Sequence, residues 1–401
     1  LLDKVESHLG SASDLATVVV AGETKTGLAS FEQALEESFP ELAPASTHRD
    51  APAFWLYTSG STGPPKAAIH RQRDMVYCLE LFAKQILQIT AHDRTFSASK
   101  LFFAYGLGNA LYFPFGVGAT TVLLPDRATP EKVFQVLRRY QPTIFYAVPT
   151  LYAALLQATD AEPSNFRSVR LAVSAGEALP APVWEKFKAR FGLEIIDGIG
   201  STEMLHMFIS NRPGDVMPGS SGKLVPGYEA RITDEQGRAV ADGEIGNLWV
   251  SGESAAAGYS NRPERTAATF VGEWTLTGDK YIRDAKGYYW YCGRSDDMLK
   301  VAGLWVSPLE IETALLAHPA VVECAVVGAN DSDGLTKPKA FVVAKAPAAA
   351  NPQFQAELRE FLRGKLAGYK VPEWIVVVES LPKTATGKIQ RFKLRSEPTL
   401  S

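Results

Sequence analysis

The chain has 401 residues, of which 46% are hydrophobic and 21% charged, and its formal net charge is −3. This composition excludes a disordered or fibrous chain, and the near-neutral charge does not indicate a nucleic-acid or anionic membrane partner. The sequence has three single cysteines (Cys78, Cys292 and Cys324), no CxxC pair and no run of 18 apolar residues. This pattern favours a cytoplasmic protein without a membrane span.

The first segment with a chemical signature is YTSGSTGPPK, which runs from Tyr57 to Lys66. Glycine lets a backbone approach a ligand closely, and successive N–H groups beside hydroxyl side chains form a concave anion site. Lys66 adds a positive charge suited to phosphate oxygens. The apolar run Phe54–Leu56 predicts a buried strand before this loop. The GxxxxGK[ST] pattern of a P-loop is absent, and the alternative interpretation is a solvated turn.

Between about residues 54 and 200, short apolar runs alternate with longer segments of helical period. This alternation predicts parallel strands joined by crossover helices, an α/β architecture whose ligand-binding loops follow the carboxyl ends of the strands. The predicted strands include 143–148, 169–176 and 193–200, and the predicted helices include 130–140 and 180–192.

A Gly-Ser-Thr-Glu sequence, Gly200–Glu203, follows the last of these strands. A hydroxyl beside a carboxylate at a strand end can hold a phosphate together with Mg²⁺, which takes one or two carboxylates and leaves its other positions to water and phosphate. For Thr202 and Glu203 alone, a helix cap is an equally good interpretation.

From about residue 219 to residue 293, short strands separated by Gly-rich turns predict a β-rich, barrel-like unit. Asp279, in the sequence Thr-Gly-Asp, could accept hydrogen bonds from both hydroxyls of a ribose. An aspartate in such a sequence is more often a turn residue. A domain boundary is predicted near 293–303.

The remaining residues predict a small α+β domain. Ser307 as N-cap and Glu310 three residues later predict the start of a helix that ends before Pro319. Lys388 lies in the basic stretch 382–391, for which a solvated tail is the usual explanation. The other predicted elements are strands at 321–328, 337–345 and 374–379 and a helix at 353–367.

In combination and in order, these motifs resemble those of the adenylate-forming enzymes, which include acyl-CoA synthetases, peptide-synthetase adenylation domains and luciferases. The matching segments cover nearly the whole chain: YTSGSTGPPK, SAGEALP (174–180), GSTE, GNLWVSG, GYSNRPERT (258–266), TGD, GRSDDMLK (293–300) and PKTATGK (382–388). Within this superfamily the resemblance is strongest to benzoate–CoA ligases, and it is carried by KLFFAYGLGNALYFP (100–114), DGIGSTEMLHMFISNRPG (197–214) and DGLTKPKA (333–340).

The resemblance implies a two-step ligase that uses ATP, Mg²⁺ and coenzyme A. An aryl carboxylate, implied to be benzoate, attacks the α-phosphate of ATP and gives an acyl adenylate and pyrophosphate. The thiol of CoA then attacks the acyl carbon and gives the aryl-CoA and AMP. The implied fold is a large N-terminal domain (1–295) of parallel α/β sheets with a β-rich, barrel-like subdomain, and a small mobile α+β C-terminal domain (296–401) that turns about a hinge at Asp296.

The resemblance also implies roles for individual residues. Lys388 would bridge the carboxylate and the α-phosphate, Thr202 would contact the α-phosphate, and Glu203 would hold Mg²⁺. The implied phosphate-binding residues are Thr58, Ser59, Gly60, Ser61, Thr62, Gly63 and Lys66. The other implied nucleotide-binding residues are Gly176, Glu177, Ala178, Asp197, Gly198, Ile199, Gly200, Ser201, Asp279 and Arg294.

The acyl pocket implied by the resemblance is an aromatic and glycine-rich segment together with the residues after Glu203. Glycines there would leave a thin slot for a flat ring. The alternative interpretation is a core strand and helix start with His206 as a core histidine. The implied pocket residues are Phe103, Ala104, Tyr105, Gly106, Gly108, His206 and Met207, and the implied CoA-binding residues are Lys300, Gly303 and Trp305.

Other functions remain open. One is a different acyl-CoA synthetase or an adenylation domain that loads a carrier protein, although no carrier module follows. Another is an inactive nucleotide-binding fragment. Because the chain starts at Leu1 and superfamily members have a further N-terminal stretch, we expect the large domain to be incomplete and its open surface to favour self-association. We expect a monomer or a homodimer, and the sequence does not determine which aryl acid is preferred.

Overall fold

The computed structural model divides the chain into two compact units, residues 1–48 and 49–401. The residues that it describes are Leu2, Glu6, Leu9, 16–25, 27–38, 41–58, 65–301, 304–331, 333–345, 352–383 and 389–395. The first unit pairs β1 (Val19–Val20) in parallel with β2 (Ala29–Ser30). Helix α2 (Phe31–Glu37) follows, and the Ser30 hydroxyl accepts a hydrogen bond from its first turn.

The second unit holds all the predicted site residues. Its first half contains β3 (Pro52–Thr58), β4 (Lys66–Arg71), α3 (Gln72–Cys78), η1 (Leu79–Lys84), β5 (Arg94–Ser97), α4 (Ala104–Leu107), η2 (Gly108–Tyr112), α5 (Phe113–Val117), β6 (Thr120–Val122), α6 (Pro130–Tyr140), β7 (Ile144–Ala147), α7 (Pro149–Gln157), η3 (Pro163–Phe166), β8 (Leu171–Ser174), α8 (Ala181–Phe191) and β9 (Ile195–Gly200).

Its second half is richer in strands. The elements are β10 (Met207–Ser210), β11 (Lys223–Leu224), β12 (Glu229–Thr233), β13 (Gly246–Ser251), α9 (Pro263–Thr269), β14 (Phe270–Val271), β15 (Trp274–Arg283), β16 (Tyr289–Arg294), β17 (Leu299–Val301), β18 (Leu304–Val306), α10 (Pro308–Leu316), β19 (Val321–Asn330), β20 (Thr336–Ala344), α11 (Pro352–Arg363), η5 (Gly368–Lys370), β21 (Trp374–Val377) and α12 (Arg391–Arg395).

The central sheet confirms the predicted α/β class. It has seven strands in the order β11-β10-β9-β8-β7-β5-β6, and the strands from β9 to β6 are parallel. Helix α6 spans the predicted residues 130–140, and α8 lies within the predicted segment 180–192. In the described part of the chain, no helix has both the length and the apolar character needed to cross a membrane.

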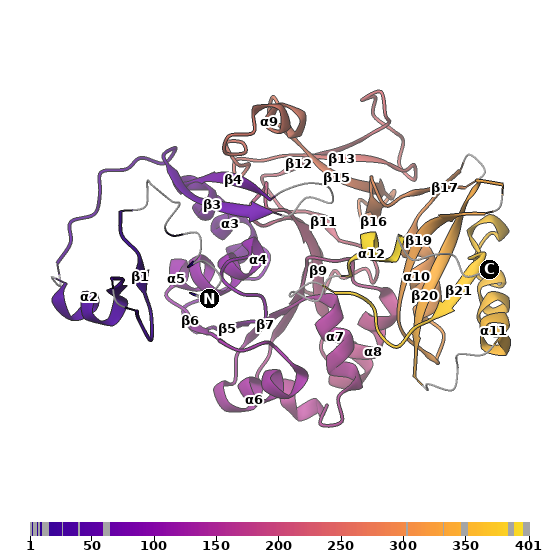
Figure 1. The fold of residues 1–401 in the computed structure, drawn as a ribbon, viewed down its shortest axis with the longest axis horizontal. Coiled ribbons are helices and arrows are strands. Elements are labelled where there is room, and N and C mark those ends of the chain that lie inside the picture. Colours follow the sequence, from indigo (N-terminus) through magenta and orange to yellow (C-terminus); the bar gives the residue numbers. More distant parts are fainter. Residues whose placement is uncertain are drawn as a thin grey trace. The chain divides into compact units, whose positions relative to one another are not determined.

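The sheet is covered on both faces, which explains why its strands are continuous apolar runs. Side chains of a strand point alternately to opposite faces, so Ile144 and Tyr146 of β7 enter one core cluster while Phe145 and Ala147 enter another. The second cluster includes side chains of α6, α7 and α8. Figure 1 shows α7 and α8 side by side near β9.

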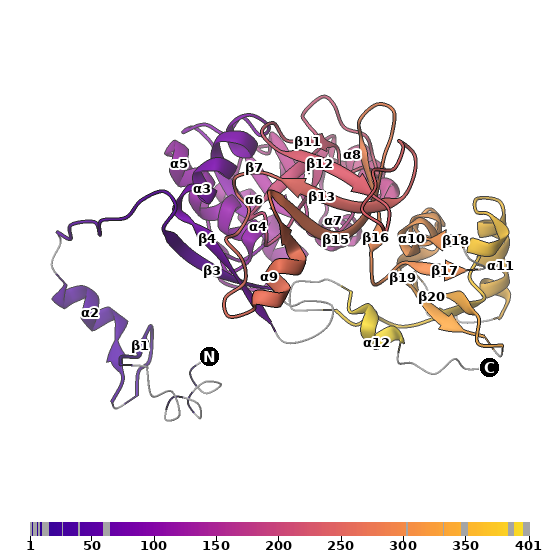
Figure 2. The same cartoon turned by 90° about the horizontal axis from the view of Figure 1, so that it is seen from above.

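The β-rich and C-terminal parts also follow the prediction. Strands β12, β13, β15 and β14 form one sheet with β16 added on β15, and Figure 2 shows β12, β13, β15 and β16 together. Ser307 caps α10, which ends at Leu316 before Pro319. Strands β19, β20 and β21 form the C-terminal sheet, and α11 ends at Arg363, four residues before the predicted end. The domain boundary at Asp296 stays a prediction.

One expectation about the first motif was wrong. The run Phe54–Leu56 does belong to a strand, β3, but this strand pairs only with β4 as a two-stranded antiparallel sheet and does not join the parallel sheet. Trp55 and Tyr57 are 58% and 69% exposed, and only Leu56 of the run is buried. A two-stranded sheet has one face on the core, so alternate apolar side chains remain outside.

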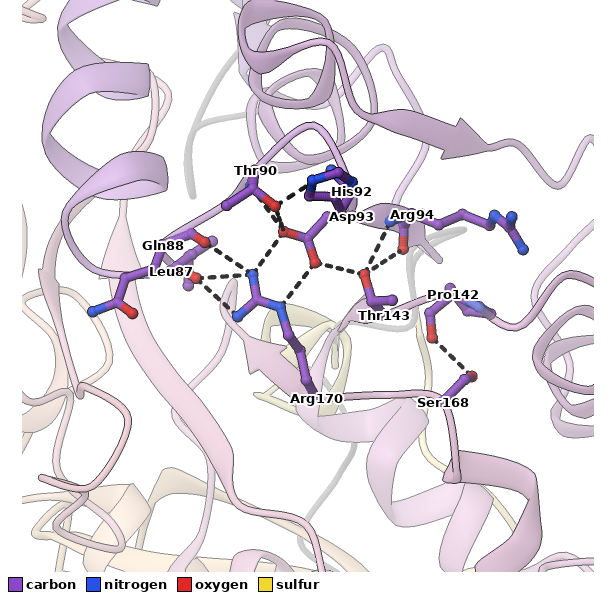
Figure 3. A network of polar contacts seen from close by, with 10 residues as sticks. All are labelled: Leu87, Gln88, Thr90, His92, Asp93, Arg94, Pro142, Thr143, Ser168 and Arg170. Carbon is purple, nitrogen blue, oxygen red and sulfur yellow. Dashed lines mark hydrogen bonds and ion pairs between the residues drawn. The ribbon is translucent and has the colours of Figure 1, made fainter.

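A polar network around the buried carboxylate of Asp93 ties together the amino ends of the parallel strands (Figure 3). Asp93, before β5, accepts bonds of 2.8 and 2.9 Å from the Arg170 guanidinium and one of 2.7 Å from the Thr143 hydroxyl. Arg170 also donates to the Leu87 carbonyl. Burial raises the pKa of Asp93, but hydrogen bonds from Arg170, Thr143 and the Thr90 backbone outweigh it and lower the pKa from 3.8 to about 2.

We predict that Asp93→Asn lowers the free energy of unfolding by about 1–3 kcal/mol, because a charged acceptor of several hydrogen bonds is lost. The depressed pKa means that the carboxylate stabilises the fold fully above pH 4 or so, and that this advantage disappears as the pH falls towards about 2. Urea denaturation of both proteins between pH 7 and pH 3 measures the difference.

The matched control is Asp160→Asn, which removes an ion pair of 3.4 Å with Arg138 whose side chains are 44% and 49% exposed. We expect this change to cost less than about 1 kcal/mol. Equal effects of the two substitutions at pH 7 would contradict a special role for the Asp93 network.

Candidate functional site

Two of the predicted nucleotide-binding segments follow the carboxyl ends of neighbouring strands of the central sheet, β8 and β9. Because β8 and β9 are parallel, their carboxyl ends lie at the same edge of the sheet, and Ser174 is the register partner of Asp197. Gly176 follows β8 with a φ of 93°, a conformation that favours glycine. Residues 201–206 follow β9 as a turn, in which Ser201 accepts a hydrogen bond from the Met204 N–H.

The motif Tyr57–Lys66 forms the end of the β3–β4 hairpin. Thr58 and Lys66 are register partners, so the loop between them begins and ends at the same place. The predicted phosphate-binding residues Ser59–Gly63 lie outside the described residues.

Three side chains from distant parts of the sequence meet beside this hairpin. The Lys66 ammonium donates a hydrogen bond of 2.7 Å to the Tyr259 hydroxyl and lies 4.1 Å from the centre of its ring. That hydroxyl donates a bond of 2.6 Å to Oε1 of Glu203, which is 3.7 Å from the ammonium. Burial, and secondarily the Glu203 charge, raises the pKa of Tyr259, so the hydroxyl keeps its proton. A cation and an anion are therefore held together by a neutral bridge.

Sequence reasoning missed Tyr259. The segment 258–266 contributed to the family resemblance, but its tyrosine received no role. The backbone explains its placement, because the Ile69 N–H bonds to the Gly258 carbonyl and Ala68 forms an isolated bridge with Tyr259. The segment with Tyr259 pairs with β4, the strand that follows the Gly-rich loop. A tyrosine in that segment could therefore have been expected near the loop.

The predicted ribose-binding residues are neighbours. Asp279 on β15 and Arg294 on β16 are register partners, and the guanidinium donates a bond of 3.1 Å to the carboxylate. Burial raises the pKa of Asp279 against the lowering effect of Arg294, and the charge of Glu203 adds to the rise. The ribose pair therefore lies within electrostatic reach of the cluster formed by Lys66, Tyr259 and Glu203.

Asp197 is a buried carboxyl group at the predicted adenine site. Its side chain sits on β9, and its Oδ1 has no hydrogen-bond partner among the described residues. Burial raises the pKa of Asp197 to about 8. The group is therefore mostly protonated near pH 7 and can donate a hydrogen bond as well as accept one.

His206 is buried among aromatic rings. The rings of Phe82, Tyr105 and Phe113 lie 5.2, 5.6 and 4.6 Å from its own, measured between centres. Its Nε2 is 3.2 Å from the Asn109 amide oxygen, and its Nδ1 has no partner among the described residues. Burial lowers the pKa of His206 to about 3, so the imidazole is neutral near pH 7.

The glycines predicted to open a thin slot are packed against protein atoms. A Cβ added to Gly106 would lie 2.0 Å from the Lys100 carbonyl oxygen, and one added to Gly108 would lie 2.5 Å from the His206 ring. The Lys100 ammonium donates hydrogen bonds to the carbonyls of Leu124 and Asp126. The assignment of this pocket stays a prediction.

The other pocket residues lie around these glycines. Ala104, Tyr105 and Gly106 begin helix α4, Phe103 precedes it, and the Tyr105 hydroxyl donates to the Val173 carbonyl at 3.0 Å. Met207 starts β10 and is buried, with its sulfur against Gly198 of β9. Of the residues after Glu203, His206 therefore lies against Tyr105 and Gly108 of this segment.

The C-terminal residues are only partly described. Lys300 and Trp305 are register partners on β17 and β18, and the Lys300 ammonium is 5.8 Å from the centre of the Trp305 ring, which is 40% exposed. Gly303 and Lys388 lie outside the described residues. Arg395 of α12 donates to the Asp296 carbonyl at 3.4 Å, so the predicted hinge contacts the last described helix.

Two protein-family models match the chain. The model for the AMP-binding enzyme matches residues 2–260, and the model for the AMP-binding enzyme C-terminal domain matches residues 310–388. The chain belongs to this family. It is therefore a member of the adenylate-forming superfamily that its motifs resemble.

Relatives with known names are similar over nearly the whole chain. The benzoate–CoA ligase of Thauera aromatica is 54% identical over 99% of this chain and 75% of its own. The 4-hydroxybenzoate–CoA/benzoate–CoA ligase of Rhodopseudomonas palustris is 46% identical over 98% of this chain and 73% of its own. A crystal structure of the anthranilate CoA ligase AuaEII with anthranoyl-AMP is 48% identical and superposes with a TM-score of 0.94 over 98% of this chain and 76% of that one.

We predict that Gly108→Ala lowers the free energy of unfolding by about 1–3 kcal/mol, because the added methyl group overlaps the buried His206 ring. Thermal or urea denaturation measures the loss. Gly368→Ala is the matched control, since nothing lies within 4 Å of a Cβ at that position. If both variants are as stable as the parent, His206 does not pack against Gly108 as described.

Proposed function

We propose that this family member is an ATP-dependent aryl acid–CoA ligase that acts through an acyl adenylate and releases AMP and pyrophosphate. Two observations carry the proposal: the meeting of Lys66, Tyr259 and Glu203, and the Asp279–Arg294 pair, on whose carboxyl pKa the Glu203 charge acts. Together they offer a cation for phosphates, a carboxylate for a metal ion and a carboxylate for ribose hydroxyls. The named relatives, which include benzoate and hydroxybenzoate CoA ligases, support the aryl acid and the thiol.

In the first step, an oxygen of the aryl carboxylate attacks the α-phosphorus of ATP. The bond from that phosphorus to the bridging oxygen breaks, and pyrophosphate leaves. Lys66 would neutralise phosphate charge, and Asp279 would accept hydrogen bonds from the ribose hydroxyls while Arg294 keeps the carboxylate in place. Charges fixed in advance stabilise the transition state without reorganisation. Lys388 would hold the carboxylate and the α-phosphate together, which reduces the entropic cost of the reaction.

The chemistry of Glu203 fits a role as a ligand of Mg²⁺. Among the described residues no cluster of three or more His, Cys, Asp or Glu side chains exists, but Mg²⁺ in nucleotide sites takes only one or two carboxylates. Tyr259 bonds to Oε1 of Glu203, and none of the described hydrogen bonds uses Oε2. When bound there, Mg²⁺ would supply positive charge to the triphosphate.

In the second step, the sulfur of CoA attacks the acyl carbon of the adenylate. The bond from that carbon to the phosphate oxygen breaks, AMP leaves, and the thiol proton is released. We propose that residues 297–401 turn about Asp296 between the two steps, which withdraws Lys388 and brings Lys300, Gly303 and Trp305 to the CoA path. The exposed Trp305 ring beside the Lys300 ammonium supports this assignment.

We propose benzoate as the preferred acid. The predicted pocket contains a neutral His206 and the ring of Tyr105, whose hydroxyl is already bonded to a backbone carbonyl. An apolar pocket accepts an unsubstituted ring, whereas a site with a matched hydrogen bond would favour a substituted one.

The cysteine pattern favours a cytoplasmic enzyme, and a monomer or homodimer stays a prediction.

The function is tested by pyrophosphate release from MgATP with benzoate, with and without CoA, on this 401-residue chain. We expect release that depends on benzoate, and AMP with benzoyl-CoA when CoA is added. Reactions without acid, and with 4-hydroxybenzoate or anthranilate, are the controls. Binding of ATP without release for any of these acids would contradict the ligase and favour a nucleotide-binding fragment.

The role of the last motif is tested by Lys388→Ala. We expect it to slow adenylate formation by about a hundredfold or more, because one preorganised charge is removed. Thioester formation from supplied benzoyl adenylate and CoA should stay within a few fold of the parent. The matched control is Lys383→Ala, at a lysine close to Lys388 in the sequence, which breaks an ion pair of 2.6 Å with Glu323. Equal losses in both half-reactions would contradict the proposed rotation of residues 297–401 about Asp296 between the two steps.

A further inference from the structure

A buried histidine connects the phosphate hairpin to the turn that carries Thr202 and Glu203. Lys66, Ala68 and His70 share one face of β4, because side chains of a strand repeat every second residue. Lys66 reaches the Glu203 side chain through Tyr259. His70, four residues later, is fully buried, and its Nε2 lies 2.8 Å from the Thr202 carbonyl oxygen.

The second nitrogen of the His70 ring is held by a buried carboxyl group. Nδ1 lies 2.9 Å from Oδ2 of Asp74, whose side chain is also 0% exposed. The same oxygen accepts a bond of 2.9 Å from the Arg71 N–H at the start of α3. The Phe54 ring lies 5.5 Å from the imidazole, measured between centres. The ring is therefore fixed from two sides.

The bonding pattern determines which way the Nε2 bond points. A carbonyl oxygen can only accept a hydrogen bond, so Nε2 carries the hydrogen and donates it to Thr202. Oδ2 of Asp74 holds the opposite nitrogen, Nδ1, so the plane of the ring is fixed while Nε2 bonds to the peptide carbonyl.

The consequence concerns the turn itself. Residues 202–203 belong to no helix or strand. The Thr202 carbonyl accepts bonds from His70 and, at 3.3 Å, from the Leu205 N–H of the same turn, and the Glu203 carbonyl accepts one of 2.8 Å from the Ala256 N–H outside it. On the basis of the proposed function, we infer that His70, oriented by Asp74, is a positioning residue that sets Thr202 and Glu203 for MgATP in the adenylation step.

Three substitutions test this inference on the full chain. His70→Leu removes both bonds. His70→Gln keeps an N–H donor near the position of Nε2 and loses the contact with Asp74. Asp74→Asn keeps the ring and weakens its orientation. Asp93→Asn is the matched control, because it breaks the hydrogen bonds of a buried carboxylate at the opposite, amino end of the parallel strands.

Two properties are measured for each variant: the affinity for MgATP by calorimetry, and the rates of the two half-reactions with benzoate or supplied benzoyl adenylate. We expect His70→Leu to weaken MgATP binding and adenylation by about 10- to 100-fold, with thioester formation changed less than about threefold. His70→Gln should recover most of the loss, and Asp74→Asn should show a smaller loss of the same kind. Asp93→Asn should lower thermal stability and leave the ratio of the half-reactions unchanged.

The inference is overturned if the His70 and Asp74 variants lower both half-reactions alike, as loss of folded protein would, or if His70→Gln is no better than His70→Leu. If His70→Leu does not fold, His70→Gln and Asp74→Asn test the inference through the same quantity, the ratio of the adenylation rate to the rate of thioester formation. Failure of the proposed function is distinguishable, because the unsubstituted chain would then show no adenylation with any aryl acid while MgATP affinity still reports on the turn.

Discussion

The hydrogen bonds of the Tyr259 hydroxyl are the interaction on which the rest of the site depends. An ammonium and a carboxylate that leave water lose solvation, and their attraction compensates only when hydrogen bonds complete the arrangement. Tyr259 accepts from Lys66 and donates to Glu203, so it satisfies both while keeping them 3.7 Å apart. At this distance the two charges form an ion pair, and the hydroxyl takes one hydrogen-bonding position of each.

The two ends of the parallel strands in the central sheet differ in how their buried carboxyl groups are bonded. At the amino ends of its parallel strands, the Asp93 carboxylate accepts hydrogen bonds from Arg170 and Thr143. At the carboxyl ends, Asp197 is buried with an oxygen that no described residue satisfies. A buried polar atom without a partner is costly, and such atoms are tolerated where a ligand completes them. The buried carboxyl group at the amino ends thus has its partners within the protein, whereas the one at the carboxyl ends has an oxygen without a described partner.

Sequence patterns predicted the elements better than their contacts. Helices α6, α8 and α10 and the parallel strands were expected from periodicity, caps and apolar runs, which are local properties. The exposure of Trp55 was not expected, because an apolar run does not reveal whether a strand has neighbours on both sides. Tyr259 and His70 were missed for the same reason: each acquires its role from a partner more than 50 residues away.

The burial of His206 has a consequence for the kinds of acid that the predicted pocket can choose between. With a pKa of about 3, the imidazole carries no charge from mildly acidic to alkaline solution. If His206 lines the acyl pocket as predicted, its uncharged ring neither forms an ion pair with a second carboxylate nor repels an ammonium group on the substrate ring. Discrimination among ring substituents beside His206 would come from volume rather than from ionic attraction.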